Sequence, residues 1–485
     1  MADRFPNMSN VLFRSGTAPL PSPQRRALLR TLAAAALPSA LAACGGGGGN
    51  AGGGVDPAPQ PVRRALPGSA VMKVRAFAGG WVALAEKLRP LANVTTPERH
   101  LLLADGTGAQ TATYRPPEGW SLLDFAVHPS TDISAVLGTN RAVRLVRLDR
   151  LGRLLAQADF ADPLAATDPY MGDPLQIRDS GALLPYGTRD AARLAALGED
   201  VVMALRTGRN AVLAYRLRQS VAGVQTGWRT LVEPGVAIGA IGLTSGTFDP
   251  FGGLDNQWQV FLDVDAGGAI AIAVNLNLTE LLEGHGDYFG QALDPSVTSG
   301  ALVTRLDAGG RRIGATLIDT VQKSEIHALR WIDGRVVVGG RVRTEQRADG
   351  GGWDGYLAVV PAGGAALQKA TAVDVERGDV IFDIAPLGGG RMLLAGASAY
   401  LQNPAGGSIS EEAAPLLAVA DAQGRITQRI AVAAGPRHNQ LRSLAPWNGD
   451  WLLGGMTNGP GTHSADGNPG LLFADGYVRQ ATVSA

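Results

Sequence analysis

The sequence predicts an all-β protein assembled from repeated units of four short strands. Its 485 residues include 65 glycines and 29 prolines, which suits a fold with many tight turns. Short apolar stretches recur along the chain, each followed by a Gly-containing turn and a second apolar stretch. Similar stretches return after about 56 to 60 residues, a period typical of propeller blades.

The repeat is clearest in three C-terminal segments. They are residues 327–340 (HALRWIDGRVVVGG), 383–396 (DIAPLGGGRMLLAG) and 443–455 (SLAPWNGDWLLGG). A second hairpin follows, marked by Asp-x-x-Gly-Arg at 149–153, 307–311 and 421–425, with shorter forms at 105–106 and 475–476. Asp opens such a turn and Gly takes its positive-φ position, so each motif predicts a tight β-hairpin.

Strand, turn, strand, loop, strand, turn, strand is one four-stranded blade. We count seven blades, which start near Met72, Leu122, Arg193, Gln259, His327, Asp383 and Ser443. Seven units fit a single closed β-propeller after a disordered signal and linker, since radial repetition leaves only short edges. A pair of β-sandwiches or a β-solenoid is the alternative. The repeat resembles the Asp-Gly-centred propeller repeats of secreted bacterial proteins, which implies the fold and no specific activity.

The first 44 residues are typical of an export signal and are excluded from the fold. An Ala-rich apolar run, residues 31–43, ends in Leu-Ala-Ala followed by Cys44, the only cysteine of the chain. This ending resembles a lipobox, in which the cysteine is acylated and becomes the new N-terminus. A secretory signal with a chance cysteine is the alternative.

The paired Arg25 and Arg26, followed by Ala-Leu-Leu, resemble a twin-arginine export signal, with the general secretory route as the alternative. Gly45 is not the Asp that retains such lipoproteins in the inner membrane. By analogy we expect a lipid anchor in the outer membrane, on its periplasmic or surface face. Residues 45–67, and above all the Gly/Pro-rich stretch 45–62, form the predicted flexible linker, and residues 68–485 form the predicted propeller.

Composition excludes several classes of function. The 43 basic and 43 acidic residues balance, so no strong attraction to nucleic acid is expected. No later run reaches the ~18 apolar residues of a membrane helix, so the lipid is the only predicted membrane attachment. No cysteine follows Cys44, so no disulfide stabilises the predicted domain.

No motif for nucleophilic catalysis or phosphate binding occurs in the sequence. Asp263 to Gly268 (DVDAGG) resembles half of a calcium loop but lacks the further oxygen ligands, so we interpret it as a structural turn. We therefore predict no catalytic residue, metal or cofactor. A second group of acidic and imidazole side chains lacks metal-ligand spacing and is interpreted as solvated: Glu283, His285, Asp287, His438 and His463.

The two faces of a propeller differ. Loops between blades, and between strands two and three of a blade, emerge on one face, here named the upper face; hairpin turns emerge on the lower face. Function concentrates in long loops on a rigid scaffold, so we expect it on the upper face, with inert insertions as the alternative. The long loops run from Ala161 to Ala191, Glu233 to Asn256, Asn275 to Ser299, Ala397 to Ala414 and Met456 to Pro469.

The first residue of each predicted inner strand is polar. Because inner strands line the channel of a propeller, these residues should ring its upper mouth, and we hypothesise that they contact a polar ligand. The alternative is that strand starts are polar because they are solvated. The candidate ring is Lys73, Asp124, Arg193, Gln259, His327, Asp383 and Ser443.

Together these features predict a non-enzymatic, lipid-anchored protein of the cell envelope. Its propeller would be a binding scaffold for a periplasmic or surface partner, protein or polysaccharide. A hydrolase or lyase acting on a sugar or lactone at the channel mouth is the alternative. A structural part of outer-membrane biogenesis is a third hypothesis.

Overall fold

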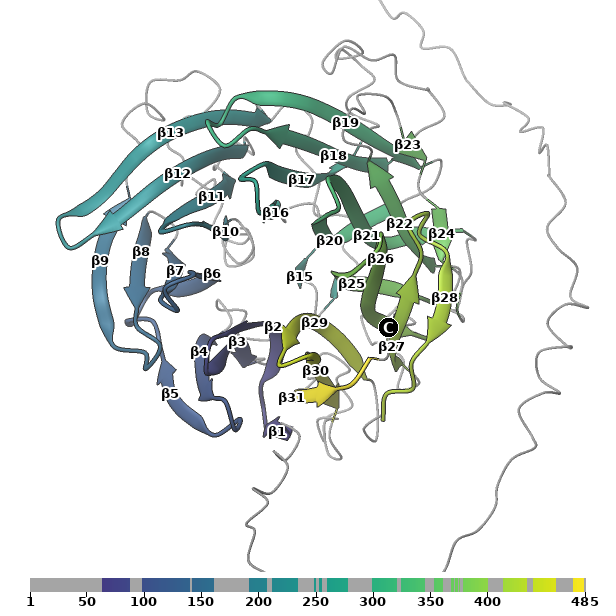
Figure 1. The fold of residues 1–485 in the computed structure, drawn as a ribbon, viewed down its shortest axis with the longest axis horizontal. Helices are drawn as coiled ribbons and strands as arrows, with labels where there is room; N and C mark the ends of the chain where they lie inside the picture. Colours follow the sequence, from purple (N-terminus) through teal and green to yellow (C-terminus); the bar gives the residue numbers. More distant parts are fainter. Residues whose placement is uncertain are drawn as a thin grey trace, which may run out of the picture. The chain divides into compact units, whose positions relative to one another are not determined.

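Within the residues that it describes, the computed structural model consists of strands and turns. These residues are 63–87, 98–139, 142–160, 192–206, 212–233, 248–249, 253–254, 260–277, 299–320, 324–344, 353–360, 368–369, 371–373, 375, 378–399, 413–433, 439–458 and 474–483. Their strands form eight sheets, seven of which surround a central channel, as Figure 1 shows. The predicted seven-bladed β-propeller is confirmed.

The first three blades take their strands from the channel outward in chain order. Blade 1 contains β2 (Ala70–Phe77), β3 (Gly80–Lys87), β4 (Glu98–Asp105) and β5 (Gln110–Tyr114). Blade 2 contains β6 (Ser121–Val127), β7 (Ile133–Gly138), β8 (Val143–Leu148) and β9 (Leu154–Phe160). Blade 3 contains β10 (Ala192–Leu197), β11 (Asp200–Arg206), β12 (Val212–Ser220) and β13 (Gly223–Glu233).

The next three blades follow the same order. Blade 4 contains β16 (Val260–Val264), β17 (Ile270–Asn277), β18 (Ser299–Leu306) and β19 (Arg312–Thr320), and β23 (Gln368–Lys369) pairs with its outer edge. Blade 5 contains β20 (Ser324–Ile332), β21 (Arg335–Arg343), β22 (Trp353–Val360) and β24 (Thr371–Val373). Blade 6 contains β25 (Val380–Gly388), β26 (Arg391–Ser398), β27 (Ala414–Ala420) and β28 (Ile426–Arg429). A separate two-stranded ladder joins β14 (Phe248–Asp249) to β15 (Gly253–Leu254).

Blade 7 closes the ring with strands from both ends of the propeller. Its inner strands are β29 (Gln440–Trp447), β30 (Asp450–Asn458) and β31 (Ala474–Ala481), and its outer strand is β1 (Arg63–Leu66). β1 runs antiparallel to β31, with Arg64 opposite Val478. Since β1 falls inside the predicted linker 45–67, the ring begins at residue 63 and not at residue 68.

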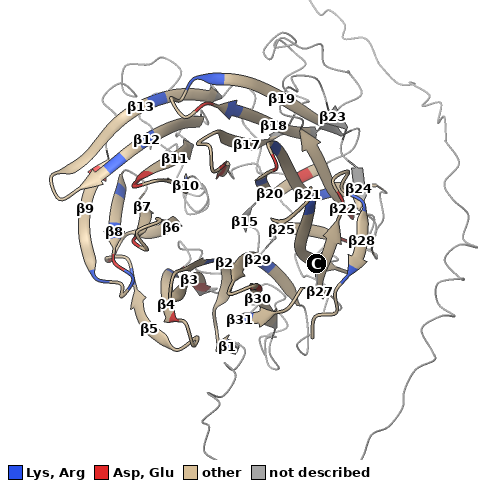
Figure 2. Cartoon of the chain, in the orientation of Figure 1, with Lys and Arg blue, Asp and Glu red and all other residues tan. Residues whose placement is uncertain are grey.

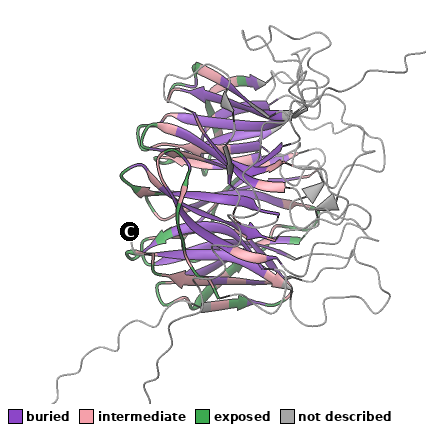
Figure 3. Ribbon diagram, turned by 90° about the vertical axis from the view of Figure 1, so that its right-hand side faces the viewer, coloured by how far each residue is buried: buried purple, intermediate pink, exposed green. Residues whose placement is uncertain are grey.

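The apolar core lies between neighbouring blades. Leu145 of blade 2 packs with Leu213 and Tyr215 of blade 3, and equivalent clusters join the other blades. Trp81, Tyr215 and Tyr356 are among the largest fully buried side chains. Buried residues run through the middle of the strands, and exposed residues gather at the turns (Figure 3). Each fully buried Val, Leu, Ile or Phe contributes about 1.5–3 kcal/mol, so packing supplies the stability.

The Asp-x-x-Gly-Arg motifs form the predicted hairpin turns. In blade 2, the N–H groups of Leu151 and Arg153 donate to Asp149 Oδ1 at 2.8 and 2.9 Å, and Arg153 Nε donates to Asp149 Oδ2 at 2.6 Å. Gly152 has a φ of 76°, the left-handed conformation that favours glycine. The turns at 307–311 and 421–425 repeat these bonds.

Five inner strands carry a β-bulge at the same place. In blade 5, Ile326 pairs with Gly340 and Ala328 with Gly339, so His327 has no partner residue on β21. In blades 5 and 6 a glycine lies beside the bulge, and a Cβ on Gly340 or Gly396 would collide with a carbonyl oxygen of the inner strand, whereas blades 1 and 2 have Ala85 and Leu137 at this position. The five bulged residues are Met72, Leu123, His327, Phe382 and Arg442.

We predict that truncation of Leu66 weakens the closure of the ring. Leu66 is 7% exposed and packs against Trp81, Leu452 and Val478, so Leu66→Ala should lower the free energy of unfolding by about 2 kcal/mol. The matched control is Leu155→Ala on β9, where the side chain is 44% exposed. Chemical denaturation measures both variants. Equal stability of the two would contradict the role of β1 as a packed strand.

Candidate functional site

The central channel contains a cavity of about 150 Å³. Residues from the inner strands of all seven blades line it, together with Leu84 of β3 and Arg99 of β4. All five bulged residues belong to this lining, because a bulge turns two successive side chains of one strand toward the channel. A second hollow of about 510 Å³ lies toward the lower face, and Lys73 and Arg75 line both.

Six of the seven predicted ring residues line this cavity, and Gln259 lies outside the described residues. The six are Lys73, Asp124, Arg193, His327, Asp383 and Ser443. Each lies one to three positions inside its strand, so the prediction that it starts the strand is wrong. Asp124, Asp383 and Ser443 are 2%, 6% and 2% exposed, so they are buried groups inside the channel and not solvated strand starts.

Three ring residues connect the inner strands of different blades. Asp124 Oδ2 accepts a hydrogen bond from the N–H of Leu194 at 2.8 Å, which joins blade 2 to blade 3. Asp383 Oδ2 accepts one from the N–H of Leu444 at 2.8 Å. Ser443 Oγ accepts one from the N–H of Val74 at 3.0 Å and closes the ring between blades 7 and 1. These side chains therefore have a structural role.

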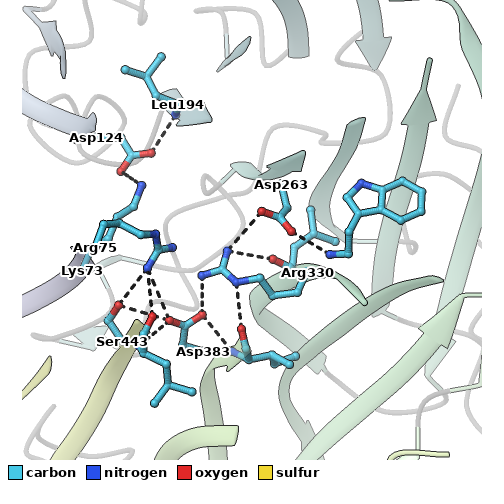
Figure 4. A network of polar contacts seen from close by, with 12 residues as sticks. Lys73, Arg75, Asp124, Leu194, Asp263, Arg330, Asp383 and Ser443 are labelled. Carbon is cyan, nitrogen blue, oxygen red and sulfur yellow. Dashed lines mark hydrogen bonds and ion pairs between the residues drawn. The ribbon is translucent and has the colours of Figure 1, made fainter. Parts of the chain in front are cut away.

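A second layer of charge, formed by Arg75, Asp263 and Arg330, lies deeper in the channel (Figure 4). Neither arginine was predicted from the sequence. Arg330 donates to Asp383 Oδ1 at 2.8 Å, and its Nη1 lies 3.7 Å from Asp263 Oδ1. Arg75 Nη1 lies 4.0 Å from Asp383 Oδ2. Arg75 follows the predicted ring residue Lys73 by two positions, the period of one face of a strand, and this spacing is its signal in the sequence. Arg330 follows the predicted ring residue His327 by three positions, because the bulge at His327 shifts the face of the strand, so the same spacing does not indicate it.

Asp263 does not belong to the structural turn that was predicted for residues 263–268. The hairpin turn begins at Asp265, whose Oδ1 accepts a hydrogen bond from the N–H of Ala269 at 2.7 Å. Asp263 instead lies on β16, and its Oδ2 accepts one from the N–H of Trp331 at 2.8 Å. It therefore belongs to the channel network and not to the turn.

Burial and neighbouring positive charges lower the pKa of Lys73. Its Nζ donates to Asp124 Oδ1 and to the carbonyl of Phe125, both at 2.7 Å. Burial lowers the Lys73 pKa to about 8 from 10.5; Asp124 opposes this decrease, and Arg75 and Arg193 add to it. Burial also raises the pKa of Asp263, although Arg330 opposes it. The Asp124 pKa is lowered: burial works against this shift, but Lys73 and Arg193 outweigh it.

Aromatic and cationic side chains meet at the upper part of the cavity. The rings of His327 and Phe382 pack edge to face with centroids 5.1 Å apart, and the Arg442 guanidinium lies 3.6 Å from the Phe382 ring centroid. Elsewhere in the lining, the buried Arg99 donates to Glu86 Oε2 at 2.7 Å. The lining is therefore mixed, with charged groups beside apolar surface.

The remaining predicted positions lie outside the described residues: Arg25, Arg26, Cys44, Glu283, His285, Asp287, His438 and His463. Within the described ranges, no group of three or more His, Cys, Asp or Glu is arranged to hold a metal ion. Those ranges also contain no helix long and apolar enough to cross a membrane.

No known family model matches the chain, and no curated protein matches its sequence. Solved propellers resemble it in fold. The WD40 repeats of RRP9 cover 87% of this chain and 99% of their own at 10% identity, with a TM-score of 0.46. Virginiamycin B lyase from Staphylococcus aureus covers 87% and 99% at 7% identity, with a TM-score of 0.44.

The β-propeller domain of the Trilobed protease from Pyrococcus furiosus, described as having an open velcro topology, covers 80% of this chain and 92% of its own. Its identity is 8% and its TM-score 0.40. These likenesses concern the fold alone. The propeller assignment of this chain rests on its own strand pairing.

We predict that Asp383→Ala destabilises the ring by about 3 kcal/mol, because it removes the acceptor of the Leu444 N–H and leaves Arg330 with less compensation in a buried site. Asp307→Ala in an exposed hairpin turn is the matched control and should cost much less. Urea denaturation followed by tryptophan fluorescence measures both. A loss for Asp383→Ala no larger than that of the control would refute the structural role.

Proposed function

We propose that this chain is a lipid-anchored protein of the cell envelope whose propeller is a binding scaffold for a periplasmic or surface partner, protein or polysaccharide. The lipobox-like ending at Cys44 and the paired Arg25 and Arg26 support export and anchoring. Residues 45–62 supply a Gly/Pro-rich tether between the anchor and the ring.

The observation that carries the binding role is the placement of the long segments. The five longest connections follow β9, β13, β17, β26 and β30. Because the four main strands of each of these blades pair antiparallel, the strand ends that flank all five connections lie at the upper face. Long segments on one face of a rigid ring are the arrangement that binding proteins use.

The first strand supports the same orientation. β1 is antiparallel to β31 and begins at the lower face, where Arg64 Nη2 donates to Gln110 Oε1 at 2.6 Å beside a hairpin turn of blade 1. A tether that precedes Arg63 therefore joins the ring at its lower face. The strand ends that flank the five long segments then lie at the face opposite Arg63, where the described chain begins.

The bonding of the channel carboxylates favours binding over acid–base catalysis. Asp124 and Asp383 accept backbone N–H groups and pair with Lys73 and Arg330. A general base or acid works best with a pKa near the operating pH, whereas the Asp124 pKa is lowered. Asp263, whose pKa burial raises, and Lys73, whose pKa burial lowers to about 8, are observations in favour of a hydrolase or lyase, and loss of a detected activity in Asp263→Asn would support that second candidate.

Site-specific photocrosslinking in cells tests the partner-binding role. A photoreactive residue is placed at Glu118, exposed on the upper face between β5 and β6, and at one position in each of the five long segments. Gln423, exposed in a lower-face turn between β27 and β28, is the matched control position. We expect one envelope partner that crosslinks from upper positions of the anchored chain and is depleted by Cys44→Ala.

Two outcomes would overturn the proposal. One is equal crosslinking of the same molecules from Gln423 and from the upper-face positions. The other is an absence of any product above background at all upper-face positions, while the full chain is exported and folded. A partner that is retained by Cys44→Ala would separate binding from anchoring and contradict only the role of the lipid.

A further inference from the structure

Lys73 is a lysine held inside the channel. Its side chain on β2 is 18% exposed and lines both the cavity of about 150 Å³ and the larger hollow toward the lower face. Figure 2 shows basic and acidic residues spread around the whole ring, so a charged side chain alone does not distinguish this position. Lys73 differs because its amine is enclosed by other side chains and still borders a cavity.

Two hydrogen bonds fix the amine in place (Figure 4). Lys73 Nζ donates to Asp124 Oδ1 and to the backbone carbonyl of Phe125, both at 2.7 Å. Among the described residues, its further close contact is the Phe125 ring, whose centroid lies 4.8 Å from Nζ. An ammonium group has three N–H donors, whereas a neutral amine has two and a lone pair. The two acceptors therefore match the donors of the neutral amine and leave its lone pair for another group.

The neutral amine forms at a lower pH than that of an ordinary lysine. Burial lowers the Lys73 pKa to about 8 from 10.5; Asp124 of β6 opposes this decrease, and the charges of Arg75 and Arg193 add to it. Because the pKa is lowered, the uncharged form increases as the pH rises through about 8. A lysine amine that is desolvated beside another cationic group is a nucleophile for carbonyl compounds.

The space beside the amine suits a small, uncharged molecule. A volume of about 150 Å³ accommodates a compact molecule and not a length of polymer. Met72, Leu123 and Phe382 supply apolar surface to the lining. An uncharged ligand leaves the ion pairs of the channel, such as that of Arg330 with Asp383, without a new charge to compensate. A short-chain aldehyde has this size and polarity, and it condenses with an amine without a cofactor.

We propose that Lys73 captures a small aldehyde as an imine inside the channel. The lone pair of Nζ attacks the carbonyl carbon, the π electrons of the C=O bond move to the oxygen, and a proton passes from nitrogen to oxygen to give a carbinolamine. The hydroxyl group then leaves as water together with the second amine proton, and the C=N bond forms. Each imine releases one water molecule, and no oxidant or reductant is consumed.

Asp124 suits the product of this reaction. An imine nitrogen that takes up a proton becomes an iminium cation and keeps one N–H for the carboxylate. The Asp124 pKa is lowered: burial works against this shift, but Lys73 and Arg193 outweigh it, so the carboxylate is anionic. Asp124 Oδ2 also accepts the N–H of Leu194 at 2.8 Å, which holds the carboxylate in place when the amine reacts. The site lies in the channel, so the proposal does not depend on the partner-binding role of the upper face.

Reductive alkylation tests the proposal, because sodium cyanoborohydride reduces an iminium to a stable amine much faster than it reduces an aldehyde. The folded full chain is treated with propanal and this reagent, and mass spectrometry of peptides measures the alkylated fraction of each lysine. We expect Lys73 to react about tenfold faster than the other three at pH 8, and this preference should decrease as the pH approaches 10.5. The four lysines of the chain are Lys73, Lys87, Lys323 and Lys369.

The unfolded chain is the matched control. In guanidinium chloride that unfolds the protein, Lys73 is an ordinary lysine, and its preference for propanal should disappear. In Lys73→Arg, intact-protein mass spectrometry should show that the fast alkylation is lost, whereas the other three lysines should react at the wild-type rate. Near-UV circular dichroism checks that the variant is folded.

The proposal is overturned if Lys73 of the folded chain reacts no faster than the other three lysines, or if its preference persists in the unfolded chain. Fast alkylation that is retained by folded Lys73→Arg would also overturn it. If Lys73→Arg does not fold, the comparison of the four lysines in the folded and unfolded wild type still decides.

Discussion

The ring depends on hydrogen bonds that cross from one inner strand to the next. An inner strand pairs on one edge only, so the N–H groups of its channel edge need acceptors. Asp124 and Asp383 supply them to Leu194 and Leu444, and Ser443 closes the ring at Val74. A buried carboxylate in turn needs a cation, which explains why Lys73 and Arg330 lie beside Asp124 and Asp383 in the channel.

The repeat made the fold predictable, whereas the closure could not be seen in the sequence. Seven units with Gly turns and Asp-x-x-Gly-Arg hairpins define the blades through contacts between residues close in the chain. β1 is only four residues long and pairs with Val478 at the other end of the propeller. The Pro67-Gly68 turn that follows it marks where a segment ends but does not identify the strand with which that segment pairs.

The candidate site was predictable in outline and not in register. The polar residue near the start of each repeat correctly indicated the channel. A bulge, however, changes by one residue which side chains of a strand face the channel, and no residue type in the sequence predicts where a bulge occurs. His327 is therefore equivalent to Phe382, and Ala328 occupies the place of Asp383. Arg330 was missed because Ala385, the equivalent residue of blade 6, is apolar, so no repeat marks the position.

The net charge of a chain says little about the charge of its channel. A balance of 43 basic and 43 acidic residues excludes a long-range field, which sums over the whole surface. Inside a channel, burial strengthens each interaction between charges, so the charged side chains close to a group determine its pKa. Lys73 is an example. Although its Nζ lies 2.7 Å from Asp124 Oδ1, burial and the repulsion by Arg75 and Arg193 lower its pKa. The carboxylates that build the ring therefore have two roles: Asp124 and Asp383 each accept a backbone N–H group of the next blade and pair with Lys73 or Arg330.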